Sequence, residues 1–502
     1  MSDKDKLKAA FQLISSVNKV AYRDLFLLSN QVLSKNFYSN NFIKNFIADE
    51  QPGHQGTLII CYKLIVYYYK NMILFSLYLF GFIAFFFSGV KRFAAEKYEK
   101  LIVIDVFLLM KQIIKAKTYK DPYFPGLDDI LLKLKKNYAY LPVFDSSRNP
   151  FALFKTLRIL KKDNVPVLCE YQLLSFFDII WLFYFIVAYP FRVLAFAIKL
   201  PMEDDGKGLL RSELINTLNH SVFNAFSRYL QGRKIACLKC GEIKLLSWYE
   251  NQTTDKNLYK GIRHNPQKIT IYGAQLFLYS KSMLNITVDE NESEFGVVPD
   301  KIIVNGRYYV PEKPGNNFIV GPSLRYAKLF STIINKIHQR NILVLLPYFP
   351  DKAGNILKLL TRARLPHDSV IIKAHPALRL SMLKKMNTGD YKVVDDDLYR
   401  LFQTAKVVVS ADSGTLVEAC SLGIHAIVVT REKTISCNPL PDLGKGVIWD
   451  EVATEEELRE TIRRMDQLRH ERGNEMDSLA REYREMFFGD CKEESVIRAF
   501  DL

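Results

Sequence analysis

The sequence predicts an α/β protein of two domains, each built on a parallel, doubly wound sheet. Two observations lead to this prediction. The chain has 502 residues, more than one hydrophobic core usually organises, so two domains are expected. In its second half, short runs of β-branched and aliphatic residues alternate with helical stretches at the spacing of βαβ units. These runs lack polar alternation, which is typical of strands that are buried on both faces.

The second half shows this alternation most clearly. Strands are expected at 341–349, 369–375, 406–412 and 425–430. The helical stretches between them are KAGNILKLLTRARL, ALRLSMLKKM, DLYRLFQTA and TLVEACSLG. From Thr454 to about Phe488 the chain is strongly helical and charged, and it opens with a capping box between Thr454 and Glu457. The tail EESVIRAF is expected to form a last helix.

The first half predicts a second α/β domain. Candidate strands lie at 100–107, 138–145, 165–171, 234–239, 242–250, 268–273 and 301–306. Segments between them, such as NPFALFKTLRILKKDN, are expected to be helical. The stretch NGRYYVPEKPGNN at 305–317 is rich in Gly, Pro and Asn, which is typical of a linker. We therefore expect an N-terminal domain over residues 1–310 and a C-terminal domain over residues 311–502.

Two apolar segments are inserted in the first domain, near 72–90 and 171–200. The first carries no charge and is about long enough to span a bilayer. The second contains Asp178 and Arg192, which are costly at a bilayer centre, and Pro190, which kinks a helix. Buried core helices are the alternative interpretation. We expect contact with a membrane, because two such aromatic-rich segments exceed what one domain normally hides.

Charge and cysteine content limit the possible partners. The net charge of +15 suits nucleic acid, an anionic membrane surface or phosphorylated substrates. Nucleic acid is not expected, because the Lys and Arg residues are dispersed and no recognition motif appears. The seven scattered Cys residues indicate a reducing compartment, and the single C-x-x-C at Cys237 and Cys240 does not predict zinc. No signal peptide is expected.

A His-Pro turn follows the strand predicted at 369–375. Lys373, His375 and Pro376 lie where that strand ends, and ligands of open α/β sheets collect beyond the carboxyl ends of strands. The imidazole of His375 can donate an N–H to a phosphate, and Pro376 favours a sharp turn into the next helix. A surface histidine with no ligand is the alternative for this turn taken alone.

A hydroxyl-rich turn follows one βα unit later. It contains Ser410, Asp412, Ser413, Gly414 and Thr415. The free N–H groups of such a turn and the positive end of the helix dipole both favour an anion, although ordinary helix capping also explains these residue types. Two such turns on neighbouring strands are expected to converge on one crevice. Glu418, on the first turn of the following helix, could reach a ribose hydroxyl or interact with the dipole.

KAHP followed by SADSGTLVEACSLGIHAIVV resembles the nucleotide-binding domain of glycosyltransferases with the two-domain GT-B architecture. The resemblance is to bacterial surface-polysaccharide enzymes, including sialyltransferases and capsule Kdo transferases, and covers about residues 341–429. It implies two Rossmann-like domains and a nucleotide phosphate held by the His-Pro and Ser/Thr motifs. The Ser/Thr motif appears here as Ser413-Gly414-Thr415. An acidic pair followed by Gly, also expected in the sialyltransferases, could be EDDG at 203–206.

Two carboxylates at predicted strand ends are candidates for a general base. Glu250 stands among Trp248, Tyr249 and Asn251, which could pack against a sugar. A carboxylate there could take the proton of an acceptor hydroxyl, although an ion pair with a nearby Lys or Arg explains it equally well. The segment around Glu250 also looks like a recurring stretch in surface-carbohydrate transferases. Asp105, at another strand end, ranks second.

The run of Asp395, Asp396 and Asp397 satisfies the D-x-D pattern of metal-dependent transferases. It lies at a predicted helix start, where the helix dipole stabilises acidic residues, so we interpret it as a cap. No metal and no cofactor are expected. The charge of a leaving nucleotide would then be held by helix ends, Lys373 and His375.

The sequence therefore predicts a metal-independent GT-B glycosyltransferase, attached to one leaflet at the cytoplasmic face of the plasma membrane. It would move a sugar from a nucleotide donor to a lipid-linked or polysaccharide acceptor. A CMP-activated acidic sugar is the first choice of donor, and UDP- and GDP-sugars stay open. The alternatives are a CDP-alcohol phosphotransferase of the teichoic-acid type and a non-catalytic membrane component of a polysaccharide assembly complex.

Overall fold

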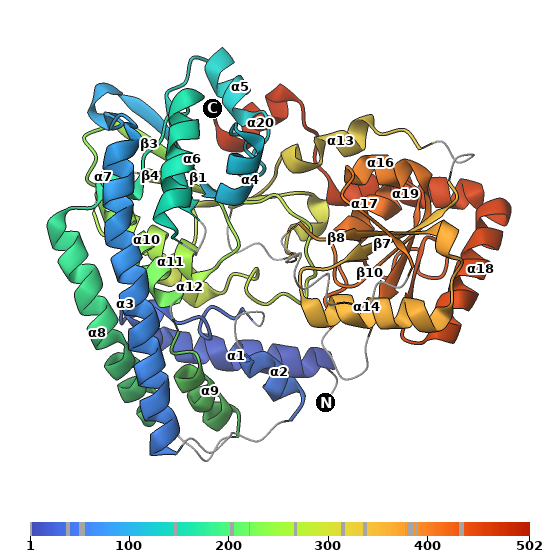
Figure 1. Ribbon diagram of the computed structural model, residues 1–502, viewed down its shortest axis with the longest axis horizontal. Helices are drawn as coiled ribbons and strands as arrows, with labels where there is room; N and C mark the ends of the chain where they lie inside the picture. The colour runs from blue at the N-terminus through green and yellow to red at the C-terminus, as the bar shows by residue number, and fades with distance from the viewer. Residues whose placement is uncertain are drawn as a thin grey trace.

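Two six-stranded sheets organise the protein, and all strand pairs in both sheets are parallel (Figure 1). The computed structural model describes residues 3–36, 41–49, 56–144, 148–200, 205–219, 221–265, 269–312, 317–334, 339–376, 378, 386, 390–430 and 436–502. Helices pack around each sheet. The expected architecture of two Rossmann-like domains with apolar helices in the first is therefore confirmed.

The first sheet has the strand order β2-β1-β3-β4-β5-β6. Its strands are β1 (Lys100–Leu108), β2 (Tyr138–Phe144), β3 (Glu242–Trp248), β4 (Ile269–Gln275), β5 (Lys301–Val304) and β6 (Asn317–Val320). β1 lies between β2 and β3 and is buried over almost its whole length, as its mostly apolar sequence predicted. Five of the expected strands are thus present as β1 to β5.

Two of the strand predictions for the first half are wrong. The segment 165–171 makes only an isolated bridge between Tyr140 and Val167, because Pro166 has no N–H to extend the pairing and a short helix begins at Glu170. In the segment 234–239, the first two residues instead end helix α10 (Ser221–Ile235), and the rest form a turn and irregular chain. α10 crosses α11 (Thr253–Ile262) so closely that a Cβ atom on Gly232 would lie 2.2 Å from the Leu258 carbonyl oxygen. The packing of α10 against α11 therefore outweighs the β propensity of this segment, and no strand forms.

The second sheet has the order β12-β11-β10-β7-β8-β9. Its strands are β7 (Asn341–Leu346), β8 (Val370–Ala374), β9 (Lys392–Val394), β10 (Ala405–Ser410), β11 (His425–Val429) and β12 (Trp449–Val452). The four expected strands are confirmed as β7, β8, β10 and β11. β9 and β12 were not expected, because β9 is a three-residue edge strand and β12 carries two acidic residues.

Helices fill the connections. In the first domain they include α1 (Asp3–Ala21), α2 (Phe42–Ile47), α3 (Thr57–Ser88), α4 (Met110–Ala116), α5 (Leu127–Lys133), α6 (Pro150–Lys162), α7 (Glu170–Leu173), α8 (Phe176–Lys199), α9 (Asp205–Asn216) and α12 (Glu290–Glu294). Later helices include α13 (Ala327–Ser331), α14 (Pro350–Ala363), α16 (Leu398–Thr404), α17 (Thr415–Ser421), α18 (Glu455–Glu471), α19 (Gly473–Phe487) and α20 (Glu493–Phe500). The capping box at Thr454 and the last helix are confirmed. Most of the helix expected at 377–386 lies outside the described residues.

The chain crosses between the domains later than the boundary expected at residue 310. β6 pairs with β5 of the first sheet, so the crossing follows Val320. The last helix then returns to the first domain. The ring of Phe500 lies 6.1 Å from that of Phe124, and the Tyr272 hydroxyl donates a 2.7 Å hydrogen bond to Asp501. The two domains are therefore joined by two segments of the chain.

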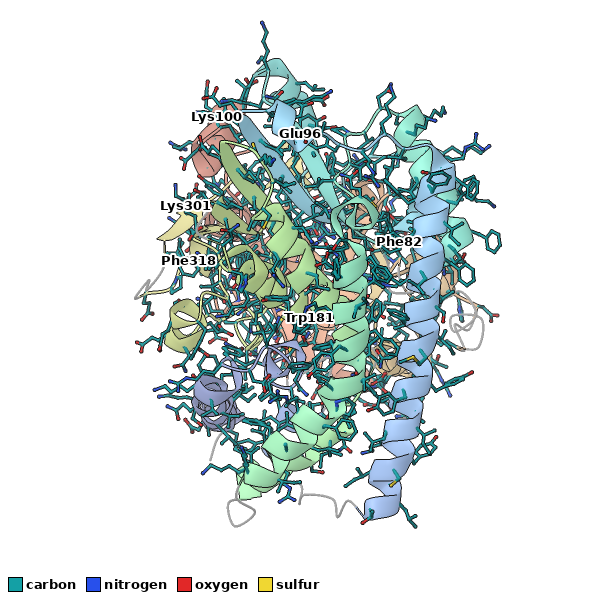
Figure 2. All side chains as sticks on the ribbon, turned by 90° about the vertical axis from the view of Figure 1, so that its left-hand side faces the viewer. Phe82, Glu96, Lys100, Trp181, Lys301 and Phe318 are labelled. Atoms are coloured by element: carbon teal, nitrogen blue, oxygen red, sulfur yellow. The ribbon has the colours of Figure 1, made fainter. Side chains whose placement is uncertain are left out.

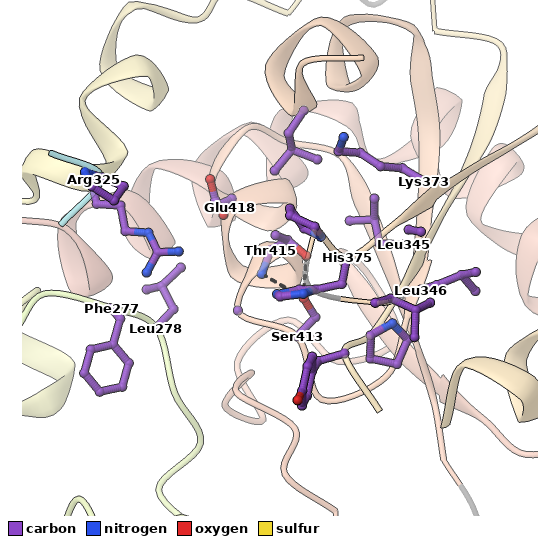
Figure 3. A pocket seen from close by; sticks show the side chains of 18 of the residues that line it. Phe277, Leu278, Arg325, Leu345, Leu346, Lys373, His375, Ser413, Thr415 and Glu418 are labelled. Carbon is purple, nitrogen blue, oxygen red and sulfur yellow. Dashed lines mark hydrogen bonds between the residues drawn. The ribbon is translucent and has the colours of Figure 1, made fainter. Parts of the chain in front are cut away.

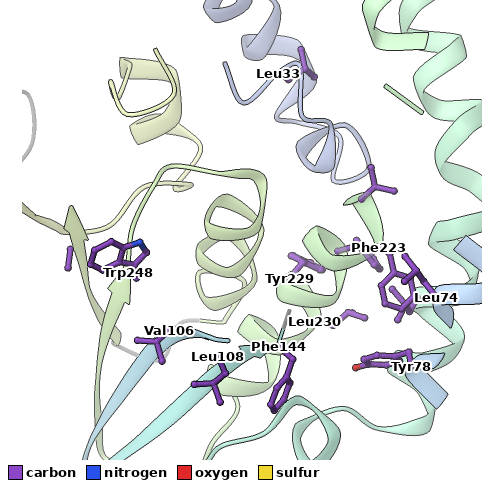
Figure 4. Close-up of a cluster of buried hydrophobic side chains, with 14 of the residues drawn as sticks. Leu33, Leu74, Tyr78, Val106, Leu108, Phe144, Phe223, Tyr229, Leu230 and Trp248 are labelled. Atoms are coloured by element: carbon purple, nitrogen blue, oxygen red, sulfur yellow. The ribbon is translucent and has the colours of Figure 1, made fainter. Parts of the chain in front are cut away.

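The two apolar segments form α3 and α8, which run antiparallel along one side of the first domain (Figures 1 and 2). The Tyr67 hydroxyl donates to the Ile186 carbonyl at 3.1 Å, and the rings of Phe75 and Phe183 lie 5.5 Å apart. From Tyr67 onward, one face of α3 is buried, at Tyr67, Asn71, Leu74, Tyr78, Gly81, Ala84, Phe85 and Ser88. Leu74 and Tyr78 join Phe223 in the core beside the first sheet (Figure 4).

Candidate functional site

An open cleft of about 1450 Å³ lies where the carboxyl ends of the two sheets face each other. Its first-domain wall comes from the residues that follow β1, β3 and β4, and its second-domain wall from those that follow β7, β8 and β10. This is the position at which open α/β sheets bind ligands. The site residues expected from the sequence that line it are Glu250, Lys373, His375, Pro376, Asp412, Ser413, Gly414, Thr415 and Glu418.

The His-Pro turn directly follows β8. The backbone N–H of His375 donates to the Leu346 carbonyl at 3.0 Å, which fixes the turn against the end of β7. The imidazole faces the cleft 5.9 Å from the Tyr348 ring. Partial burial, and then the charge of Arg325, lower the pKa of His375 below its usual 6.5. At neutral pH the ring is therefore uncharged and has one N–H to donate.

Lys373 is held beside this turn. Its ammonium group donates to the Asp396 carbonyl at 2.7 Å and lies 3.8 Å from the Asp395 carboxylate. Asp397, the third acidic residue of that run, accepts from the Tyr399 backbone N–H and caps α16, as expected. Among the described residues, no three His, Cys, Asp or Glu side chains gather as a group that could hold a metal ion.

The hydroxyl-rich turn carries the chain from β10 into α17. The Ser413 and Thr415 hydroxyls are hydrogen-bonded to each other at 2.6 Å and line the cleft (Figure 3). Asp412 has a positive φ of 44°, accepts a 2.9 Å hydrogen bond from the Cys437 backbone N–H and pairs with Lys352. Ser410 does not line the cleft, because its buried hydroxyl donates to the Leu345 carbonyl at 2.7 Å. It ties β10 to β7 instead.

Glu418 is buried at the back of the cleft. Its carboxylate accepts a 2.6 Å hydrogen bond from the Tyr399 hydroxyl. Burial raises the pKa of Glu418 to about 7, although Tyr399 and the charge of Arg325 act in the opposite direction. Near neutral pH this carboxyl group therefore changes protonation state easily. It can accept from a ligand hydroxyl or donate to a ligand oxygen.

Glu250 stands on the first-domain wall, directly after β3. The Trp248 indole N–H donates to its Oε1 at 3.0 Å, and the Gln252 amide donates to its Oε2 at 3.3 Å. Asp255 accepts from the backbone N–H groups of Glu250, at 3.1 Å, and Gln252, at 3.0 Å, which anchors the loop to α11. Glu250 forms no ion pair with any Lys or Arg that the structure describes. The ion-pair interpretation of this carboxylate is therefore not supported.

Asp105 is buried away from the cleft. Its carboxylate pairs with the Arg228 guanidinium, and its other oxygen accepts a 2.8 Å hydrogen bond from the Ser247 hydroxyl. Only 3% of its surface is exposed, so it cannot reach an acceptor hydroxyl in this structure. This placement corrects the expectation of a rival base. Asp105 lies inside β1 rather than at its end, and its partner Arg228 lies 123 residues away in the chain.

Several residues of the cleft carried no signal in the sequence. Arg325 lies in the segment that crosses between the sheets after β6, a strand that the sequence did not predict. Tyr123 and Phe277 come from loops after the first-sheet strands, and Tyr399 comes from α16. Only the three-dimensional fold brings these side chains together. Of the EDDG motif, residues 203 and 204 lie outside the described residues.

Comparison with solved structures finds loosely similar folds. The UDP-GlcNAc 2-epimerase from Neisseria meningitidis, bound to UDP-GlcNAc, aligns over 80% of this chain and 99% of its own, with 11% identity and a TM-score of 0.42. MurG from Acinetobacter baumannii aligns over 80% and 99%, with 12% identity and a TM-score of 0.40. The wall teichoic acid polymerase TagF aligns over 88% and 96%, with 10% identity and a TM-score of 0.40. No protein-family model and no curated protein matches the sequence. With identities and TM-scores this low, these matches assign no activity to the chain.

Proposed function

We propose that this protein is a glycosyltransferase that moves a sugar from a nucleotide donor onto a lipid-linked or polysaccharide acceptor. One observation carries the proposal: a single cleft holds a carboxylate, Glu250, on one wall and two anion-compatible turns, at His375 and Ser413, on the other. Transfer from a phosphate-activated sugar to a hydroxyl needs both parts. A base must accept the hydroxyl proton, and donors must stabilise the charge of the leaving phosphate.

The nucleotide would bind at the second domain. The His375 imidazole N–H, the Ser413 and Thr415 hydroxyls and the backbone N–H groups of their turn would donate to its phosphate, and Glu418 would contact the ribose. Glu250 would take the proton of the acceptor hydroxyl as that oxygen attacks the anomeric carbon. The new glycosidic bond forms, the bond to the phosphate oxygen breaks, and the nucleotide leaves with the bonding electrons. A CMP-activated acidic sugar stays the first choice of donor, with no metal required.

The helix pair α3–α8 would hold the enzyme at the membrane. Both helices are long and apolar enough to cross a bilayer. Yet the chain before α3 and the chain after it enter the same domain: Lys35 forms a buried 3.0 Å ion pair with Glu292, and β1 follows α3 directly. A helix with both flanks in one domain cannot cross on its own. We therefore propose that the outer face of the pair enters one leaflet, at the cytoplasmic face.

Nucleotide binding and product analysis test this function. A thermal-shift titration with CMP, CDP, UDP and GDP should give a concentration-dependent rise in Tm with at least one of them. His375→Ala should lower turnover by about 10²-fold or more, because a preorganised donor to the leaving group is lost. His470→Ala, at an exposed residue of α18, is the matched control and should change neither turnover nor the rise in Tm with nucleotide.

Three outcomes would contradict the proposal. Full turnover by His375→Ala would remove that residue from the site. Binding of none of the four nucleotides would favour a non-catalytic component of an assembly complex. Release of CMP from CDP-glycerol, with transfer of glycerol phosphate and no transfer from any nucleotide sugar, would replace glycosyl transfer by phosphotransfer.

A further inference from the structure

Arg325 places a free cation in the cleft. Its side chain is exposed, lines the cleft from the connecting segment and points into it (Figure 3). Within the described part of the chain it forms no ion pair and no hydrogen bond. The cations of the opposite wall are engaged, since Lys352 pairs with Asp412 and Lys373 donates to the Asp396 carbonyl. A guanidinium with five donors and no anionic partner therefore faces the space that a substrate would occupy.

Arg325 belongs to a wall that also presents an aromatic surface. Its guanidinium carbon lies 5.7 Å from the centre of the Trp248 ring, which itself packs against Tyr123 at 4.6 Å and Phe277 at 5.4 Å. All four residues line the cleft. Trp248 is only 2% exposed, so the half-buried rings of Tyr123 and Phe277 supply the aromatic contact area, which the apolar face of a sugar ring fits.

The same indole ring connects this wall to the proposed base. The Trp248 N–H donates to Glu250 at 3.0 Å, so the guanidinium, the aromatic surface and the carboxylate are neighbours around one side chain. A negatively charged sugar placed here would be repelled by Glu250 unless a cation compensated. Arg325 supplies that compensation, and Lys111 is a second cation of the first domain that lines the cleft.

We propose that this wall is a subsite for a negatively charged acceptor sugar, whose carboxylate or phosphate group binds Arg325. The planar fork of an arginine matches both groups with two parallel hydrogen bonds. The inference rests on the proposed function, because it places a hydroxyl of that sugar at Glu250. It goes further by naming the acceptor class as acidic or phosphorylated rather than neutral.

The fluorescence of Trp248 provides a direct test. The full-length protein is titrated with glucuronate, glucose 6-phosphate and glucose, and the Trp248→Phe variant identifies the signal of this indole among the three tryptophans. We expect at least one anionic sugar to bind more tightly than glucose. Arg325→Gln should weaken that binding about 10- to 100-fold, as loss of a charge-assisted bidentate contact does, and leave glucose unchanged. Arg307→Gln, at an exposed arginine outside the cleft, is the matched control.

The two anionic sugars distinguish the chemistry. Binding of glucuronate alone identifies a carboxylate site, and binding of glucose 6-phosphate alone identifies a phosphate site. Equal affinity for glucose and both anionic sugars, no binding of either anionic sugar, or an Arg325→Gln variant with native affinities would overturn the inference. A nucleotide titration of the same samples keeps the two proposals apart. Loss of the sugar preference with normal nucleotide binding contradicts the subsite alone, and absence of nucleotide binding contradicts the proposed transferase.

Discussion

Gly414 of the second domain lies directly against Leu278 of the first. A Cβ atom on Gly414 would come within 2.8 Å of the Leu278 Cβ and 3.0 Å of its carbonyl oxygen. Both atoms belong to or adjoin the backbone, so neither can swing aside. The turn that carries Ser413 and Thr415 is therefore positioned in part by the opposite domain, and glycine is required there by close approach rather than by a special φ.

Gly414→Ala should disturb both the turn and the domain contact. We expect weaker nucleotide binding and a loss of about 1–3 kcal/mol in the free energy of unfolding, the usual cost of overpacking. Urea unfolding and a nucleotide titration measure the two effects. Gly354→Ala is the control: it lies in α14 with no atom within 4 Å of an added Cβ, and alanine favours a helix. Native binding and stability in Gly414→Ala would show that the contact is not needed.

Glu250→Gln should separate chemistry from binding. The amide keeps the shape of the side chain and can still accept from the Trp248 indole, so folding and nucleotide binding should be preserved. Transfer should fall by about 10²- to 10⁴-fold, because only proton abstraction is lost. Single-turnover transfer and thermal shift with nucleotide measure the two properties on one sample. An active Glu250→Gln enzyme would show that Glu250 is not the base.

Asp105→Asn should lower stability, whereas Glu250→Gln should lower transfer. The Arg228 guanidinium is 3% exposed and would be left without its counter-charge. Removing one partner of a buried pair costs about 3–5 kcal/mol, so this variant should lose stability before it loses any specific step. Urea unfolding distinguishes the two variants. Normal stability with abolished transfer in Asp105→Asn would return this residue to the chemistry.

The central strands could be predicted because their sequences are mostly apolar and lack polar alternation. β1, β7, β10 and β11 are buried on both faces, and the hydrophobic pattern alone locates them. Three of the four edge strands, β6, β9 and β12, were not predicted. β12 contains Asp450 and Glu451, which do not favour a strand. It forms a strand because it pairs with β11. The false strand at 234–239 shows the opposite case, in which a helix crossing at Gly232 overrides a β-prone run.

Some residues of the cleft could likewise be predicted from the sequence, and others could not. The His375 and Ser413 turns follow strands that the sequence could locate, and the parallel order of the sheet brings them to one edge. Arg325 could not be found, because it lies beyond β6 on a connection whose path depends on both sheets. Ser410 shows the limit of motif reading: the residue type fits an anion site, but its hydroxyl is used within the sheet.

Acid should destabilise the fold through His425. This side chain is buried at the start of β11, where burial, and then the charge of Arg469, lower the pKa of His425 to about 4, against the opposing charge of Asp466. The unfolded chain takes up this proton below about pH 6.5 and the native protein does not, so the free energy of unfolding falls as pH falls from 6.5 to 4. The loss amounts to about 2 kcal/mol at pH 5.

His425→Leu removes this titration and keeps the side chain apolar. Urea unfolding at pH 7 and pH 5 should therefore show a smaller pH-dependent loss in the variant than in the native protein, by about 2 kcal/mol. The comparison between the two pH values is independent of any packing change that the substitution causes. Identical pH dependence in both proteins would show that His425 is not the group responsible.

Membrane attachment should depend on the exposed aromatic residues at one end of the helix pair. Phe86 and Phe87 close α3 with 78% and 70% of their surface exposed, and Phe176 and Phe177 open α8 with 75% each. Tyr171, just before α8, packs against Phe85, so the end of α3 and the start of α8 lie together.

The protein should float with lipid vesicles in high salt, because salt screens charge attraction but does not weaken the insertion of apolar side chains. Replacing both Phe86 and Phe87 by Asp should release it, since each charge would have to enter the leaflet. Ile333→Asp, at a residue that is 86% exposed after α13, is the control and should float normally. Flotation that salt abolishes, or that the double substitution leaves intact, would contradict insertion of this face.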